Sequence, residues 1–303
     1  MIEFHKAQPA QKAAYESILF SCPPRGCEYS FANLNLWGLQ NIAFLHGCAA
    51  LFSHFYGRSV YPYPIGSGDK KAVIEAILHD AKMRGIPCRI TGMTDADREE
   101  LEALFPGKFT FRTDRDGFDY VYAIDDLADL KGRKFQKKRN HANRFRLNHP
   151  DYEVIPLTSC NMARARHMIN DWYRTRMKED PEGNYLLENI ALSRACDKFE
   201  NLGMDGILLC DGGEVLAVTI GSRMGADTFD IHFEKAREDV DGAYTVINQE
   251  FARYLRLKYP HIAYLDREED MGLEGLRKAK LSYNPHHLVQ KHWAYLTEEI
   301  QGD

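Results

Sequence analysis

Residues 227–266 read DTFDIHFEKAREDVDGAYTVINQEFARYLRLKYPHIAYLD and contain two kinds of periodicity. Residues 227–235 alternate between apolar and polar side chains, which predicts a β-strand with two different faces. Residues 243–258 repeat apolar side chains at helical spacing, and residues 261–266 return to a short strand pattern. The stretch therefore predicts two parallel strands joined by a helix.

The order of elements around this stretch occurs twice in the chain. A predicted hairpin at 205–222 precedes it, and in the first half a similar hairpin precedes a strand, a helix at 69–84 and a strand at 88–93. Corresponding elements are offset by nearly the same number of residues, which favours an internal duplication over coincidence. We therefore expect an α/β (α+β) fold with two mixed sheets and flanking helices, divided into domains at 1–130 and 131–303.

The composition is that of a globular chain, with 44% hydrophobic and 27% charged residues and a formal net charge of −5. The sequence has no run of about 18 apolar residues that would predict a membrane span, and its first residues do not resemble a secretory signal. Seven cysteines without a CxxC pair predict reduced thiols and no structural metal. These features predict a cytoplasmic protein without a transmembrane segment.

Three segments carry a resemblance to a known family: Lys131–Phe145 (KGRKFQKKRNHANRF), Asp230–Lys235 with Gly242–Phe251, and Tyr264–Pro285 (YLDREEDMGLEGLRKAKLSYNP). They resemble the phosphatidylglycerol lysyltransferase C-terminal domain family, and the last is also similar to Fem-type peptidoglycan aminoacyltransferases. With the aromatic segment Glu28–Leu34, the resemblance covers nearly the whole chain and is closest to cytoplasmic members without the flippase region. It implies a tandem GNAT fold and an acyltransferase or aminoacyltransferase that uses aminoacyl-tRNA as cosubstrate.

A basic run between Leu130 and Pro150 contains eight Lys or Arg residues and no acid. Phe135, Ala142 and Phe145 are spaced to share one apolar face, so the run predicts a basic linker helix at the start of the second domain. Its charge favours a polyanion, such as tRNA, another phosphate-bearing substrate or the surface of an anionic membrane. The alternative is a linker helix whose charges pair with nearby acids. The candidate substrate contacts are Lys137, Lys138, Arg139, Asn140 and Arg144.

A second group of candidates lies on the predicted strands of the second half. Asp230, His232 and Glu234 share one strand face, and Glu234 is the best placed to take a proton from an acceptor amine. Asp266 and Arg267 follow the next strand, where open α/β sheets bind ligands. The alternative for Asp230, His232 and Glu234 is the polar outer face of a strand, and the alternative for Asp266 and Arg267 is a charged surface loop.

A third group lies in and just after the last predicted helix, at 274–281, which precedes a last predicted strand at 287–295. Acyl transfer needs a positive charge near the developing oxyanion and an acid for the leaving group. The resemblance to Fem-type enzymes nominates Lys280, and Tyr283 lies where acetyltransferases of this fold often have their general acid. The alternative is that the cations of this group lie at the C-terminus of a helix, where they interact favourably with its dipole, and that Tyr283 packs under the turn. Arg277 and Asn248 complete the candidate substrate-binding residues.

The turn at Glu238–Tyr244 has one glycine and three acids, which disfavours the pyrophosphate of CoA at the following helix N-terminus. We therefore expect an aminoacyl group to move from aminoacyl-tRNA to an amine or hydroxyl acceptor. The alternatives are an acyl-CoA-dependent N-acyltransferase and a non-enzymatic module that binds RNA or an anionic surface.

Overall fold

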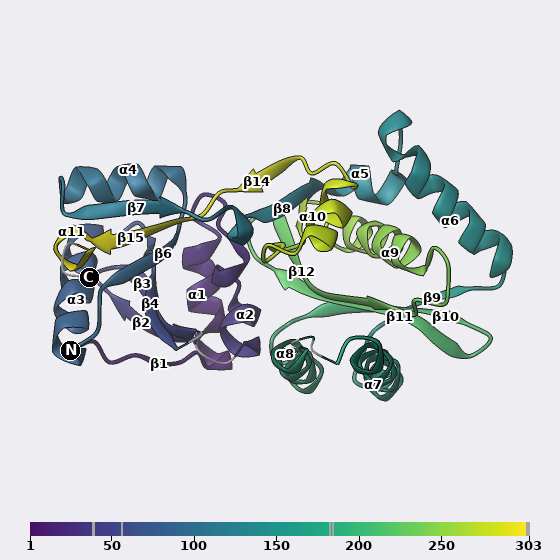
Figure 1. The fold of residues 1–303 in the computed structure, drawn as a ribbon. Helices are drawn as coiled ribbons and strands as arrows, with labels where there is room; N and C mark the ends of the chain where they lie inside the picture. Colours follow the sequence, from purple (N-terminus) through teal and green to yellow (C-terminus); the bar gives the residue numbers. More distant parts are fainter. Residues whose placement is uncertain (38–39, 56, 182, 184, 301–303) are drawn as a thin grey trace. The chain divides into compact units, whose positions relative to one another are not determined.

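The structure is a computed structural model of the 303-residue chain, and it describes residues 1–37, 40–55, 57–181, 183 and 185–300. The chain forms two compact units, each assembled from more than one segment. Unit 1 comprises Met1–Asp119, Glu269–Arg277 and Leu288–Asp303, and unit 2 comprises Tyr120–Glu268 and Lys278–His287. Figure 1 labels the elements of both units.

Unit 1 is built on a mixed sheet with the strand order β1-β2-β3-β4-β6-β15-β7. Its strands are β1 (His5–Lys6), β2 (Gln40–Leu45), β3 (Cys48–Phe55), β4 (Arg58–Pro62), β6 (Arg89–Met93), β15 (His292–Leu296) and β7 (Phe109–Thr113), with β5 (Ile65–Gly66) paired to β3. The β4–β6 pair is parallel, and the other neighbouring pairs are antiparallel. The helices are α1 (Lys12–Leu19), α2 (Phe31–Leu36), α3 (Lys70–Arg84), α4 (Asp95–Leu104) and α11 (Thr297–Ile300).

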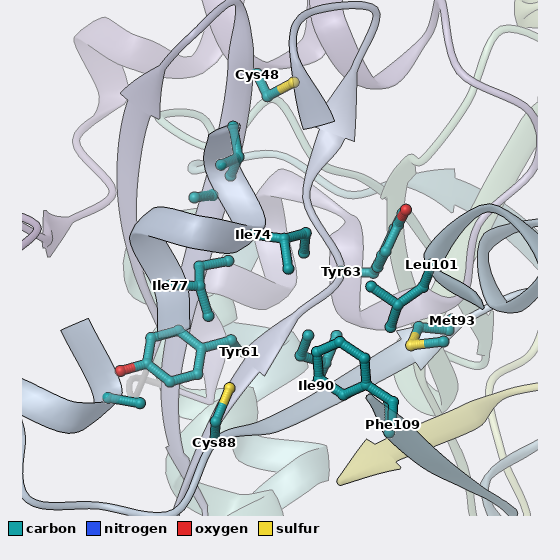
Figure 2. Packing of buried hydrophobic residues seen from close by; sticks show 14 residues of the cluster. Cys48, Tyr61, Tyr63, Ile74, Ile77, Cys88, Ile90, Met93, Leu101 and Phe109 are labelled. Carbon is teal, nitrogen blue, oxygen red and sulfur yellow. The ribbon is translucent and has the colours of Figure 1, made fainter. Parts of the chain in front are cut away.

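Helix α3 links the parallel strands β4 and β6 and carries an apolar face into the unit 1 core. The side chain of Asp69 accepts a hydrogen bond from the amide of Ala72 at its start, and Gly85, at φ 67°, ends the helix in the left-handed region. Ile74 and Ile77 point into a cluster with residues of β4, β6 and α4 (Figure 2). The helix expected at 69–84 is thus confirmed to within one residue.

Unit 2 is built on a mixed sheet with the strand order β14-β8-β13-β12-β11-β10-β9. Its strands are β14 (His287–Val289), β8 (Asp119–Ala123), β13 (Tyr264–Asp266), β12 (Thr228–Ala236), β11 (Glu214–Arg223), β10 (Asp205–Asp211) and β9 (Glu153–Pro156). The parallel pair β12–β13 is joined by α9 (Ala243–Lys258). Figure 1 shows α9 on one face of this sheet and α7 (Met162–Glu179) and α8 (Leu186–Asp197) on the other. The remaining helices are α5 (Ile124–Asp129) and α6 (Gln136–Asn148), and α10 (Glu274–Leu281) is divided between the two units after Arg277.

The two sheets have the same strand order when β1-β2-β3-β4-β6-β15-β7 is read beside β9-β10-β11-β12-β13-β8-β14. In both, α3 or α9 links the parallel pair at the matching positions, as an internal duplication predicts. The strand that lies between the second parallel strand and the edge strand is exchanged between the units. β8 follows the unit 1 strand β7 in sequence but lies in the unit 2 sheet, and β15 follows the unit 2 strand β14 but lies in the unit 1 sheet. A single boundary at residue 130 therefore does not describe the two units, because β8 precedes it and β15 returns to unit 1.

The strand expected at 287–295 is divided into β14 and β15, with Lys291 between them. Lys291 is buried, and its ammonium lies 2.8 Å from carboxylate oxygens of both Asp119 and Glu28. In the part of the chain that the structure describes, no helix combines the length and the apolar character needed to cross a membrane.

Candidate active site

Both sheets have a place where two parallel strands part, and such openings are where α/β sheets bind ligands. In unit 1 the pairing of β4 with β6 ends at Pro62 and Thr91. Just beyond, the hydroxyl of Tyr29 lies 3.0 Å from the carbonyl oxygen of Tyr63 and 3.2 Å from that of Gly92. A side chain of unit 1 itself therefore occupies this opening.

In unit 2 the pairing of β12 with β13 ends at Asp230 and Asp266, both fully buried. Strand β12 continues to Ala236, and charged side chains rather than a single aromatic residue surround the region beyond the last pair. This opening collects most of the candidates that follow the strands of the second half. It is the candidate active site.

Glu234 and Arg267 form the central ion pair of this site. Arg267 Nη2 lies 2.9 Å from Glu234 Oε1, and Asn248 Nδ2 lies 3.2 Å from Glu234 Oε2. The guanidinium of Arg267 also stacks on the rings of Tyr122 and Tyr283, at 5.9 and 5.1 Å from their centres. Burial would lower the pKa of Arg267, but Glu234 raises it, so the guanidinium stays charged. Because both oxygens of Glu234 accept hydrogen bonds, its carboxylate anchors Arg267 and Asn248.

Asn248 is fully buried on α9, and its Oδ1 has no hydrogen-bond partner within the described residues. A buried amide oxygen without a partner is costly, so a donor from a ligand would satisfy it. The prediction that Asn248 contacts substrate is untested, and its position beside Glu234 is consistent with it.

Lys138 of α6 lies over the ring of Tyr283, with Nζ 3.7 Å from the ring centre. Burial and the charge of Arg267 lower the pKa of Lys138 to about 8, although Glu234 acts in the opposite direction. Tyr283 is buried, and this burial raises the pKa of its hydroxyl. Lys138, predicted from sequence as a phosphate contact, is therefore part of the same cluster as Tyr283 and Arg267.

Lys280, the predicted oxyanion donor, is buried and directed at the main chain. Its Nζ donates hydrogen bonds to the carbonyl oxygens of Arg267 and Glu268, the second at 3.0 Å. Glu268 has φ 58°, and its amide donates to Asp266 Oδ1 at 2.7 Å. A non-glycine residue in the left-handed region is strained, so Lys280 and Asp266 hold the turn that presents Arg267. A direct role of Lys280 in transfer stays a prediction.

His232 of β12 lies between the carboxylates of Asp230 and Glu268. The register of β12 with β11 shifts between Ile231 and Phe233, and Phe229 and Glu234 both contact α9, so the prediction of one shared face for Asp230, His232 and Glu234 is wrong. Its Nδ1 is 3.2 Å from Asp230 Oδ2 and 3.3 Å from Glu268 Oε1, and its Nε2 is 2.8 Å from Ser222 Oγ. Burial would lower the pKa of His232, but Asp230 and Glu268 raise it to about 10. Asp230, His232 and Glu268 each offer one ligand atom, and these atoms lie close enough together to hold a divalent ion.

Arg277 belongs to unit 1, where it pairs with Asp270 and Asp116 at 2.8 and 2.6 Å. The structure therefore does not include it in the cluster around Arg267. Its predicted place in a short helix at 274–281 gave no indication of Asp116, because Asp116 is far away in the sequence.

The basic run forms the helix α6 with Phe135, Ala142 and Phe145 buried, as expected for an amphipathic linker helix. Four of its eight basic side chains form ion pairs with acids of unit 2. The ion pairs are Lys131–Asp129, Lys134–Asp126, Arg144–Asp241 and Arg146–Glu250.

Other polar side chains of the run also have local partners. Arg139 donates to main-chain oxygens that include that of Gly132, and the Asn140 amide oxygen accepts from Gln136. Lys137 is exposed and, like Arg133, makes no hydrogen bond or ion pair with another described residue. The alternative of a linker helix with paired charges therefore holds for half of the run, and binding of a polyanion by the helix stays a prediction.

The N-terminus of α9 is covered by α6. Gly242 has φ 85°, and a Cβ there would lie 2.5 Å from the carbonyl oxygen of His141 and 3.0 Å from Cβ of Phe145. The acids of this turn also have partners: Asp241 with Arg144, Glu238 with Arg176 at 3.1 Å, and Asp239 with Arg237 at 2.8 Å. A helix N-terminus ordinarily binds anions, and here the backbone of α6 lies against it.

Sequence reasoning missed a second polar cluster on the α7–α8 face of the sheet. Lys235 is buried with its Nζ 4.0 Å from the centre of the Trp172 ring and 2.8 Å from Glu188 Oε1, and Tyr173 donates to Glu188 Oε2 at 2.9 Å. These partners come from three elements, so no local pattern could have indicated them.

Comparison with known proteins gives the family of this chain. The model of the family described as phosphatidylglycerol lysyltransferase, C-terminal, matches residues 21–295. An uncharacterized protein of Mycoplasmoides gallisepticum is 26% identical over 177 residues, and the match spans 57% of this chain and 54% of that protein. The chain thus covers about half the length of this curated relative.

Solved structures cover nearly the whole chain. A conserved protein of unknown function from Bacteroides thetaiotaomicron aligns with a TM-score of 0.94 and 36% identity over 98% of this chain and 100% of that one. L-PGS from Bacillus licheniformis aligns with a TM-score of 0.69 and 15% identity over 96% of this chain and 92% of that one. FemX aligns with a TM-score of 0.60 and 11% identity over 99% of this chain and 98% of that one. The last two likenesses concern the fold alone. Together with the strand order they confirm the expected tandem GNAT fold, and the family match shows that the chain belongs to the phosphatidylglycerol lysyltransferase C-terminal family.

Proposed function

We propose that this chain is an aminoacyltransferase that moves an aminoacyl group from aminoacyl-tRNA to an amine or hydroxyl acceptor. The reaction takes place at the opening between β12 and β13 of unit 2. The observation that carries the proposal is the cluster of Arg267, Glu234, Tyr283 and Lys138 at that opening, in a chain whose family and fold are those of acyltransferases.

The packing of α6 on α9 supports a donor other than CoA. A pyrophosphate at the N-terminus of α9 would need open amides and a neutral or positive surrounding. The close approach of His141 to Gly242 covers these amides, and Asp241 is already paired with Arg144. An ester carried on the end of a tRNA requires no such phosphate site at this helix.

In this reaction the acceptor attacks the ester carbonyl, and negative charge develops on the carbonyl oxygen. Arg267 supplies a positive charge there, and its guanidinium does not need to move during the reaction. Glu234 Oε1 holds it at 2.9 Å from Nη2, and it stacks on two tyrosine rings. Lys280 and Asp266 hold the backbone that carries Arg267. They are positioning residues in this arrangement.

The proposal is tested by incubating the protein with a pool of tRNAs charged with radiolabelled amino acids and with a cell extract as the source of acceptor. We expect label to enter a product that survives mild alkaline hydrolysis of the ester, if the acceptor is an amine, or one that migrates apart from tRNA, if it is a hydroxyl. Arg267→Lys should reduce transfer by about 10²-fold, the usual loss for a group that stabilises the oxyanion. Tyr283→Phe keeps the ring that stacks on Arg267 and tests whether the hydroxyl takes part.

Arg256→Ala is the matched control, because Arg256 lies on α9 but pairs with Asp125 and Asp129 on the surface. Transfer that is equally fast in all variants, or transfer from acetyl-CoA with measurable CoA binding by calorimetry, would contradict the proposal. Circular dichroism of each variant separates loss of chemistry from loss of folding.

A further inference from the structure

Transfer of an acyl group requires a base for the acceptor and an acid for the leaving oxygen. The residues that the sequence predicted for these roles already make other contacts. Both oxygens of Glu234 accept hydrogen bonds, Asp266 is fully buried and accepts from the amide of Glu268, and Lys280 donates to two carbonyl oxygens. The hydroxyl of Tyr283, the general acid expected from the resemblance, is hydrogen-bonded to Thr245, and burial raises its pKa. The proposed reaction at the opening between β12 and β13 therefore needs another titratable group that can contact a substrate.

Lys138 meets this requirement by its position. It is half-buried, its Nζ lies 3.7 Å from the centre of the Tyr283 ring, and its ammonium makes no hydrogen bond or ion pair with any residue in the described ranges. Arg267 stacks on the same ring at 5.1 Å. Lys138 thus combines a fixed position in the cluster with free hydrogen-bonding capacity.

We infer that the ε-amino group of Lys138 is the proton-transfer group of the proposed reaction, a catalytic role that rests on the proposed function. The neutral amine takes a proton from the acceptor nitrogen or oxygen as that atom forms a bond to the ester carbonyl carbon. The bond from this carbon to the 3′-oxygen of the tRNA then breaks, and the Lys138 ammonium returns the proton to that oxygen. The products are the acylated acceptor and free tRNA, and no proton is gained or lost.

The electrostatic environment suits a group that must exist in both forms. The charged or titratable side chains that face Lys138 are Arg267 after β13, Glu234 on β12 and Tyr283 after α10. Burial and Arg267 lower the pKa of Lys138 to about 8, while Glu234 and the face of the Tyr283 ring favour the ammonium. Proton transfer is most efficient when the pKa lies near the working pH.

The first test needs no substrate. Folded protein is labelled with trace acetic anhydride between pH 6 and 11, and acetylation of each lysine is followed by mass spectrometry. We expect the labelling of Lys138 to reach half its maximum near pH 8, and to shift upward in Arg267→Gln. A midpoint at or above about 10.4, the value of a model lysine, would overturn the inference, as would a midpoint that does not respond to Arg267→Gln.

The second test uses the transfer assay. Lys138→Gln should lower kcat by about 10²–10⁴-fold, and added ethylamine should restore part of the rate with a pH dependence that follows the amine. Lys138→Arg keeps the charge but cannot release its proton at the assay pH, so it should be as slow as Lys138→Gln. Lys131→Gln, a change at an exposed lysine that pairs with Asp129, is the control and should leave kcat unchanged.

Full activity of Lys138→Arg would overturn the inference, because it would show that only the charge is needed. If the wild-type protein transfers nothing from aminoacyl-tRNA while Lys138 still titrates near pH 8, the proposed function is wrong, but the lowered pKa of the Lys138 amine is confirmed. If transfer occurs and Lys138→Gln is unimpaired, the function stands and the inference fails.

Discussion

Replacing Gly242 with Ala tests whether α6 is packed tightly against the N-terminus of α9. The new methyl group would lie 2.5 Å from the carbonyl oxygen of His141 and 3.0 Å from Cβ of Phe145, both on α6. Since the first neighbour is backbone, a side-chain rotation cannot remove the overlap, and part of α6 must shift. The residue also has φ 85°, where an L-amino acid is strained.

Gly213→Ala is the matched control, because Gly213 also has φ 85° but a Cβ there would have no atom within 4 Å. Both substitutions should cost about 1–2 kcal/mol for the left-handed conformation, and only Gly242→Ala adds an overpacking cost of about 1–3 kcal/mol. The free energy of unfolding should therefore fall by about 1–2 kcal/mol in Gly213→Ala and by about 2–5 kcal/mol in Gly242→Ala. Urea unfolding followed by circular dichroism measures both.

Equal losses in the two variants would refute the reasoning, because they would show that α6 does not press on Gly242. The support for a donor other than CoA would then lose its structural basis, since the amides at the start of α9 would be open to a pyrophosphate.

Three further predictions concern single side chains. Arg267→Gln should lower the free energy of unfolding by about 3–5 kcal/mol, because it leaves the buried carboxylate of Glu234 without its cation, and the double variant with Glu234→Gln should recover much of that loss in the same urea assay. The imidazolium of His232, whose pKa is raised to about 10, should stabilise the fold fully below its unfolded pKa of about 6.5 and lose this effect as the pH rises toward 10; the stability of the wild-type protein should therefore fall more steeply from pH 6.5 to 10 than that of His232→Gln, and parallel curves would contradict this. Tyr29→Phe should lower stability by about 1–3 kcal/mol through the lost hydroxyl contacts in unit 1, with no change in the transfer rate, and a loss of transfer in a folded variant would show that unit 1 takes part in the chemistry.

The elements with strong local periodicity could be predicted from the sequence to within a residue or two. The structure gives 243–258 for α9 and 274–281 for α10, as expected, because apolar spacing and flanking turn residues determine where these helices begin and end. The short strands β7 and β8 were not predicted, because a few residues carry too little periodicity. Which sheet a strand joins depends on partners far away in the sequence, so the exchange of β8 and β15 had no local signal.

The same distinction applies to the candidate site. The alternation along β12 predicted one face for Asp230, His232 and Glu234, and this was wrong for Glu234. The register of β12 against β11 shifts between Ile231 and Phe233, so Phe229 and Glu234 both contact α9, and such an irregularity reverses the alternation beyond it. Lys138 was assigned to a phosphate surface because its neighbours in sequence are basic. Its contact with Tyr283 joins two segments that the sequence separates, and only the packing of α6 brings them together.

The matched strand orders fit an internal duplication, and the two units differ in the side chains at the corresponding opening. Each unit retains the parting of parallel strands that gives this fold a ligand site, but Tyr29 fills it in unit 1 with hydrogen bonds to both strands. In unit 2 the corresponding position has the Asp230–Asp266 pair and the charged groups beyond it, which cost stability when they are buried. Under the proposed function the charged groups of unit 2 serve the chemistry, whereas the hydroxyl of Tyr29 closes the unit 1 opening. Substitutions at the unit 1 opening should therefore change stability, and those at the unit 2 opening should change transfer as well.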